Sequence, residues 1–130
     1  MGKGEYDLYK IIDLVRRRSG MFIGEPSTIS MSIYLSGYQQ AMRDIGAKDV
    51  TSPDFYEFHN WVQRKLGYPS STAGWSNMIL ANILGLPPNH SWNISFKLDA
   101  SEEQHDQALK RFFEFIDEYR GKGKTNNEQT

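Results

Sequence analysis

The organisation of the chain is decided by residues 15–38, VRRRSGMFIGEPSTISMSIYLSGY, which join two predicted helices through a short connection. Gly20, Gly24 and Pro26 are turn-forming residues and shape this connection. Residues 21–23 between them are Met-Phe-Ile, and leaving three such large apolar side chains in water is unfavourable. We therefore expect an ordered apolar loop that is buried between the first two helices.

Periodic apolar residues predict a helix on each side of this connection. Before it, apolar side chains at i, i+3, i+4 and i+7 predict a helix at about residues 5–19. After it, a longer apolar stripe predicts a helix at about residues 28–45. The expected buried faces are Leu8, Ile11, Ile12 and Val15 in the first helix, and Met31, Tyr34, Leu35, Tyr38, Met42 and Ile45 in the second.

Three further helices are predicted downstream. Ser52 followed by Pro53 is typical of a helix start, with a side-chain cap before proline in the first helical position. A shorter helix is expected at about residues 73–84. Ser101 and Gln104 form a capping-box pattern that starts a last helix running to about residue 120. The expected buried faces are Phe55, Phe58, Val62 and Leu66, then Trp75, Met78, Ile79 and Ile83, and finally Leu109, Phe112, Phe113 and Ile116.

Two segments lie outside this helical pattern. Residues 89–98 alternate apolar and polar side chains as extended chain does, but no partner strand is visible. We expect an ordered connector there, anchored by Trp92 and Phe96. Residues 121–130 are polar and are expected to form a flexible tail. The sequence thus predicts one all-α domain over residues 1–120, a bundle of about five helices.

Composition limits the classes of protein to consider. A chain of 130 residues with 38% hydrophobic residues is long enough to bury a core without covalent staples. Cysteine is absent, which excludes disulfides and thiolate metal sites and fits the reducing cytoplasm. No apolar run approaches the roughly 20 residues that span a bilayer. The formal net charge of −1 argues against bulk attraction to nucleic acid or to a membrane.

The sequence contains no pattern typical of catalysis or metal binding. The three histidines, His59, His90 and His105, occur singly and lack the spacing of a zinc site. There is no P-loop, no dinucleotide-binding glycine fingerprint and no Gly-x-Ser-x-Gly motif. We interpret His59 as structural or half-exposed and His105 as part of a polar helix surface. We expect a protein that is not an enzyme and has no cofactor.

The last predicted helix is strongly acidic. Residues 99–119 contain seven acidic and two basic side chains, a local charge of −5. Two interpretations remain open: a solvated helix face, or a surface that covers a basic partner and attracts it electrostatically. The candidate partner-binding residues are Asp99, Glu102, Glu103, Asp106, Glu114 and Asp117.

Arg16, Arg17 and Arg18 close the first predicted helix. Cations are favoured at this end because the helix dipole is negative there, so a solvated last turn would explain them. The same side chains have the chemistry to bind phosphate or an acidic partner. They are therefore the second candidate interface.

Residues 15–24 resemble the V-R-x-R-P-G-M-Y-I-G signature near the start of the ATPase subunit of DNA gyrase and its relatives. In that family the helix that follows carries Glu and Asp-Asn for magnesium binding and water activation. The helix that follows here reads YQQAMR at residues 38–43 and has no such acid pair. The later glycine-rich nucleotide lid is also missing, so we interpret this resemblance as local. It leaves a nucleotide-binding or regulatory module as the alternative function.

A second resemblance covers most of the chain. It rests on RRSGMFIG at residues 17–24, YLSGY at residues 34–38 with Ala41, Phe55 and Phe58 with Trp61-Val62, Gly74-Trp75 with Ile79, and FFEFIDE at residues 112–118. These motifs resemble small helical bacterial proteins of polymorphic toxin systems, including contact-dependent growth inhibition, that are regarded as immunity proteins. The proline that usually precedes Gly-Met is Ser19 here. The resemblance implies a cytoplasmic immunity protein that binds and neutralises one cognate toxin domain, without a nucleic-acid or membrane partner.

Overall fold

The computed structural model describes most of the chain in five stretches. They are residues 8–47, 53–69, 73–89, 92 and 99–128, with side chains described as far as residue 121. The expected beginning of the first helix, the expected cap at Ser52 and the expected anchor Phe96 lie outside these residues. Trp92 lies within them and is partly buried, with its ring 5.5 Å from the ring of Tyr68.

Every regular element in the described residues is an α-helix, which confirms the predicted all-α class. There are six helices in these residues instead of the expected five or so. They are α1 (Leu8–Arg17), α2 (Ser19–Ile23), α3 (Thr28–Asp44), α4 (Phe55–Leu66), α5 (Trp75–Ile83) and α6 (Glu102–Glu128).

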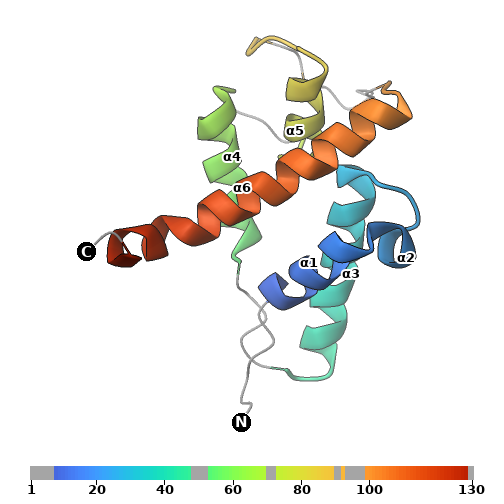
Figure 1. The fold of residues 1–130 in the computed structure, drawn as a ribbon, viewed down its shortest axis with the longest axis vertical. Helices are drawn as coiled ribbons and strands as arrows, with labels where there is room; N and C mark the ends of the chain where they lie inside the picture. The colour runs from blue at the N-terminus through green and yellow to red at the C-terminus, as the bar shows by residue number, and fades with distance from the viewer. Residues whose placement is uncertain (1–7, 48–52, 70–72, 90–91, 93–98, 129–130) are drawn as a thin grey trace.

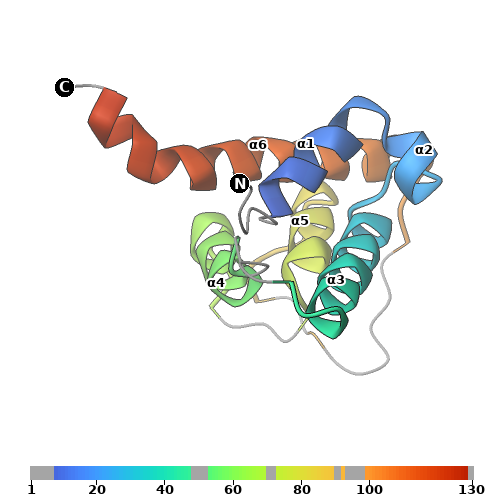
Figure 2. The same ribbon diagram turned by 90° about the horizontal axis from the view of Figure 1, so that it is seen from below.

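The helices lie in two layers (Figures 1 and 2). The long helix α6 crosses one side of the molecule together with α1, while α3, α4 and α5 lie beneath them, with α5 in the middle. A buried hydrogen bond of 3.3 Å from the Thr28 hydroxyl to the Ser76 carbonyl joins α3 to α5. α5 also contacts α4 and α6, so it is the central helix of the fold. Its buried residues are Trp75, Ser76, Met78, Ile79, Leu80 and Ala81.

Phe58 of α4 lies at the centre of an aromatic core. Its ring is fully buried and lies 5.6 Å from the Trp75 ring of α5 and 5.9 Å from the Phe112 ring of α6. Trp75 and Phe112 stack on each other with their centroids 4.6 Å apart. Aromatic pairs of this kind contribute about 0.5–1.5 kcal/mol each beyond the area that they bury. The aromatic core therefore fixes α4, α5 and α6 to one another.

Two arginine side chains hold α1 against α6. Arg16 of α1 donates to both carboxylate oxygens of Asp117, at 2.9 and 3.1 Å, and to the Phe113 carbonyl at 3.0 Å. Arg120 of α6 donates in the opposite direction, to Asp13 at 3.2 and 3.3 Å and to a backbone carbonyl of α1 at 3.3 Å. The planar guanidinium group suits such two-pronged contacts. We call these two sets of contacts the arginine clamps.

Side-chain caps confirm one predicted helix start and correct another. Ser101 and Gln104 form the predicted capping box, each donating its backbone N–H to the other's side chain at 2.9 and 3.1 Å. The prediction that Pro53 is the first helical residue is wrong, because α4 starts at Phe55 and Asp54 caps it. The Asp54 carboxylate accepts two backbone N–H groups of the first turn, at 3.0 and 3.4 Å. Aspartate and serine are equally good caps, so the sequence pattern alone did not discriminate between them.

The apolar connection is a short helix, α2, instead of the expected loop. The expected burial is wrong for Met21, which is 69% exposed, whereas Phe22 and Ile23 are partly buried. Phe22 holds α2 against α3 through an edge contact with the Tyr34 ring at 6.5 Å. Gly24 ends α2 with a φ of +84°, a conformation that L side chains rarely adopt. A helix of this length turns only part of its surface inward, which leaves Met21 facing solvent.

Several expected core positions also differ: Ile45 lies in solvent, and eight others are only partly buried, namely Ile11, Tyr34, Tyr38, Met42, Phe55, Leu66, Ile83 and Phe113. Ile45 is 75% exposed because α3 ends at Asp44, so Ile45 follows the last helical turn. Phe113 is only partly buried and lies beneath the guanidinium of Arg16 at 4.9 Å, whereas Phe115 takes a buried position that was not predicted. The apolar stripe of α6 is therefore wider than the predicted one, because the helix contacts both α1 and the α4–α5 pair.

The ends of two helices were misplaced. α1 ends at Arg17 instead of near residue 19, where α2 already begins. α6 runs to Glu128, past the expected end near residue 120. Glycine inside a helix costs about 1 kcal/mol relative to alanine, which Gly121 shows is not enough to end this helix. Among the described helices, none is both long and apolar enough to cross a bilayer.

Candidate functional site

The predicted acidic face of α6 is partly neutralised within the molecule. Asp106 pairs with Lys110 at 3.1 Å, and Glu114 pairs with Arg111 at 3.3 Å, both along the surface of the helix. Asp117 is held in the first arginine clamp. Three of the predicted partner-binding residues are therefore already paired with cations of the same chain.

The structure gathers unpaired carboxylates at the start of α6. Glu102 and Glu103 lie in its first turn and Asp99 lies just before it. All three are exposed, and none forms an ion pair with a described residue. Glu25, from the turn between α2 and α3, is also exposed and unpaired within the described residues. We call Glu25, Asp99, Glu102 and Glu103 the acidic end.

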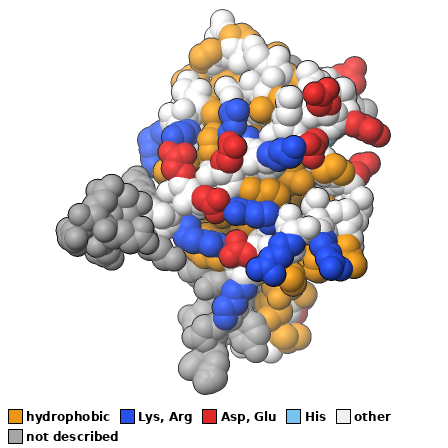
Figure 3. All heavy atoms as spheres, viewed as in Figure 1, with side chains coloured by type: hydrophobic (Ala, Val, Ile, Leu, Met, Phe, Trp, Pro, Cys, Tyr) orange, Lys and Arg blue, Asp and Glu red, His pale blue; other side chains and the backbone are white. Residues whose placement is uncertain are grey.

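Charge is distributed unevenly over the face that carries α6. Figure 3 shows acidic side chains gathered at the upper right, where Figure 1 places the start of α6. Lys and Arg side chains predominate below the line of α6, towards α1. This face therefore carries mainly acidic side chains at one end and mainly basic ones at the other, although the formal net charge of the chain is only −1.

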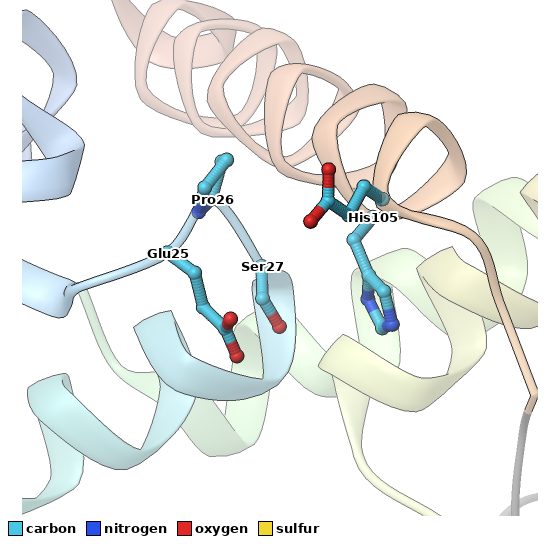
Figure 4. Close-up of a pocket in the computed structure, with 5 residues that line it drawn as sticks. Glu25, Pro26, Ser27 and His105 are labelled. Atoms are coloured by element: carbon cyan, nitrogen blue, oxygen red, sulfur yellow. The ribbon is translucent and has the colours of Figure 1, made fainter.

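A pocket of about 210 Å³ opens at the acidic end (Figure 4). Glu25, Pro26 and Ser27 form one wall, from the turn that leads into α3, and Glu102 and His105 form the other, from the first turns of α6. Ser27 is fixed in place because its hydroxyl oxygen caps α3, accepting two backbone N–H groups at 3.1 and 3.3 Å. The pocket thus has rigid backbone on both sides and carboxylates at its walls.

Only Glu102 of the pocket residues was a predicted site residue, and His105 is the titratable residue of α6 that the sequence did not identify as part of a site. It was expected on a polar helix surface, but it is partly buried and its Nδ1 atom is shielded from solvent. Nδ1 has no hydrogen-bond partner among the described atoms. The only sequence signal was its position three residues after Glu102, which places both side chains on one side of α6.

The two carboxylates of the pocket have the chemistry to bind a cation. Glu25 and Glu102 can accept hydrogen bonds from an ammonium or guanidinium group, and such charge-assisted bonds are the stronger ones. No set of three or more His, Asp or Glu residues in the described part of the chain is arranged to hold a metal ion. A basic side chain has the charge and the hydrogen-bond donors to pair with these two carboxylates.

The run of arginines is divided by the structure. Arg16 points into the fold and forms the first arginine clamp, so it has a structural role. Arg17 and Arg18 are exposed and form no ion pair with any described residue. The second candidate interface is thus reduced to these two arginines.

Comparison with known proteins gives no match: no family model fits the sequence, and neither a curated protein nor a solved structure is significantly similar to the chain.

Proposed function

We propose that the protein is a bacterial immunity protein that binds a basic toxin domain in the cytoplasm and neutralises it. One observation carries this proposal. The carboxylates of the acidic end are exposed and unpaired within the described residues, whereas Asp106, Glu114 and Asp117 are neutralised internally. The interface that we propose is therefore the start of α6, so that the partner docks end-on and does not lie along the helix.

Electrostatics supports this choice of surface. A partner that used Asp117 would compete with a clamp that holds α1 in place, whereas one that used Glu102 or Glu103 would break no ion pair of the described residues. Exposed unpaired charges also speed the encounter with an oppositely charged partner. The pocket between Glu25 and Glu102 adds a place where one basic side chain of the toxin is enclosed on several sides.

The experiment compares two variants that each remove two negative charges from α6. Glu102→Gln/Glu103→Gln changes the acidic end, and Asp106→Asn/Glu114→Gln is the matched control on internally paired residues. The protein to be tested as partner is the C-terminal domain of any large secreted protein that the neighbouring upstream gene encodes, and its association rate is measured at low and high salt.

The first variant should associate more slowly and with a weaker dependence on salt, and it should protect growing cells less well from the toxin. The control should behave like the wild type. Equal slowing in both variants would place the interface along the helix. Unchanged association in both would move it away from α6 altogether, and a toxin that does not bind the wild type would refute the function.

The alternative, a nucleotide-binding module, has no observation of its own in the described residues. The gyrase-like run forms the end of α1 and the whole of α2, and Arg16 within it is bound to Asp117. Calorimetry with ATP, in the presence and absence of magnesium, tests this alternative directly. Heat of binding that Arg16→Ala abolishes would favour it.

A further inference from the structure

A groove of about 350 Å³ lies at the corner between α1 and α2. The surface inside the groove is mainly apolar. Two of the apolar side chains that line it are well exposed, Leu14 at 47% and Met21 at 69%. Phe22, Arg17 and Arg18 complete the lining of the groove. Exposed large apolar side chains gathered in a hollow are typical of interaction sites.

The corner that carries the groove is well ordered by backbone hydrogen bonds. Arg18 donates its N–H to the Val15 carbonyl at 3.0 Å, and Met21 donates to the Arg18 carbonyl at 2.9 Å. On the inner side, the Phe22 ring contacts the Tyr34 ring of α3. Met21 is thus held outward by the same short helix that turns Phe22 inward, so its exposure is a consequence of the fold.

The two arginines that line the groove have no ion-pair partner among the described residues, whereas the two arginines of the clamps do. Arg16 and Arg120 each donate to a carboxylate and to a backbone carbonyl in the arginine clamps. Arg17 and Arg18 are exposed and have no ion pair with a described residue. Two cations free to form ion pairs beside an apolar hollow are complementary to an acidic segment that carries an apolar side chain.

We propose that this groove docks an acidic segment of a partner protein, with one large apolar side chain between Leu14 and Met21 and carboxylates on Arg17 and Arg18. Guanidinium groups bind carboxylates in a two-pronged geometry. Methionine adapts its shape to different apolar partners. An isolated phosphate would gain nothing from the apolar walls. This inference does not rest on the immunity function, because the acidic end and the groove bind groups of opposite charge.

An anionic membrane is the other surface with apolar and negative character, and the observations favour it less. Near such a membrane each Lys or Arg adds only a small attraction, so two arginines give only weak binding. The formal net charge of the chain is −1, which does not add to the attraction. Glu25 follows Gly24 at the end of α2 and is exposed, so it would be repelled by the same surface.

The test uses a fluorescently labelled synthetic peptide in which one phenylalanine is flanked by glutamates on both sides. Binding to the full chain is followed by fluorescence anisotropy and by the methyl resonance of Met21. The groove variant is Arg17→Glu/Arg18→Glu. The matched control, Arg43→Glu/Arg64→Glu, reverses two other exposed arginines, on α3 and α4.

The wild type should bind the peptide with a shift of the Met21 methyl resonance, and the groove variant should bind at least about tenfold more weakly. The control should retain binding within about threefold, the change expected from long-range charge alone in salt. Met21→Ser, which alters an exposed side chain, should also weaken binding. The inference is overturned if the wild type ignores the peptide, if both double variants weaken equally, or if the protein binds anionic vesicles through Arg17 and Arg18 while ignoring the peptide.

Discussion

At the scale of single residues, Phe58 is one of the two largest fully buried side chains and a substitution there tests the core. Its ring is fully buried and packs against rings of α4, α5 and α6. Phe58→Ala should lower the free energy of unfolding by about 3–5 kcal/mol, since the cavity cannot close around so many fixed aromatic neighbours. Tyr56→Ala, two positions away and 76% exposed, is the control and should change it by no more than about 0.5 kcal/mol. Urea denaturation of both variants measures the difference, and similar losses would contradict the assigned core.

The raised pKa values of two tyrosines lead to a second prediction at this scale, about stability in alkaline solution. Burial raises the pKa of Tyr68 above its usual value of about 10, and a hydrogen bond with Asn82 lowers it in part. The Tyr68 hydroxyl donates to the Leu86 carbonyl at 3.2 Å, which also requires the neutral form. Burial raises the pKa of Tyr119 as well.

The direction of the pH dependence follows from these raised pKa values. Below about pH 10 the hydroxyl groups of Tyr68 and Tyr119 are neutral in both the folded and the unfolded chain, so the two residues make their full contribution to stability. Above it the unfolded chain releases protons first, so stability falls as the pH rises through the folded-state pKa. Tyr68→Phe removes one ionising group and should flatten part of this fall in urea denaturation between neutral and alkaline pH. An unchanged slope would show that Tyr68 does not contribute.

At the scale of helices, the arginine clamps should couple α1 to α6. A double-mutant cycle of Arg16→Ala and Asp117→Ala should give a coupling free energy of about 1 kcal/mol, the upper end for partly exposed pairs, because the contact is two-pronged. The cycle on Lys110 and Asp106, an exposed pair within one helix, should give only about 0.3–0.5 kcal/mol. Unfolding in urea measures both. A coupling at Arg16 no larger than that of the control pair would mean that other contacts hold α1.

The elements themselves show what local sequence determines. The start of α3 and the capping box of α6 were predicted correctly, because both depend on residues within one turn of each other. The short helix α2 was missed because Gly20 within it is a typical turn residue. Contact with α3 through Phe22 favours the helical turn. Tertiary contacts decide whether such a short helix forms, and these contacts cannot be predicted from a single sequence.

The candidate site was predicted in part for the same reason. The acidic character of α6 is visible in the sequence, but which acids remain unpaired depends on partners far along the chain. Asp117 and Arg16 are 101 positions apart, and Glu118 pairs with Lys65 of α4. The pocket at the acidic end joins Glu25 to His105 across a similar gap, so spacing rules did not apply to it.

At the scale of the whole molecule, unpaired acidic and unpaired basic side chains lie on different surfaces. The acidic end and the arginines of the α1–α2 groove are oppositely charged surfaces on a chain of formal net charge −1. A partner with a basic docking surface would be drawn to the first and an acidic segment to the second. The two proposals are therefore independent, and variants of one surface serve as controls for the other.

The same scale gives a prediction about cooperativity, which tests the expected single domain over residues 1–120. The aromatic core joins α4, α5 and α6, and the arginine clamps join α1 to α6. Thr28 joins α3 to α5, and Phe22 joins α2 to α3. Every described helix thus depends on a neighbour that belongs to the shared core. Domains of this size with one core usually unfold in a single transition.

Far-UV circular dichroism, which reports all helices, and tryptophan fluorescence, which reports the core around Trp61 and Trp75, should therefore give coincident urea transitions. Native-state hydrogen exchange should be slowest in α5, because it is enclosed by α3, α4 and α6. The amides of α2 should exchange much faster, since this short helix has no fully buried residue. Separate transitions would divide the chain into independent units. Slowest exchange in a helix other than α5 would place the centre of the fold elsewhere, and either result would contradict the arrangement in which α5 supports the layer of α1 and α6 above it.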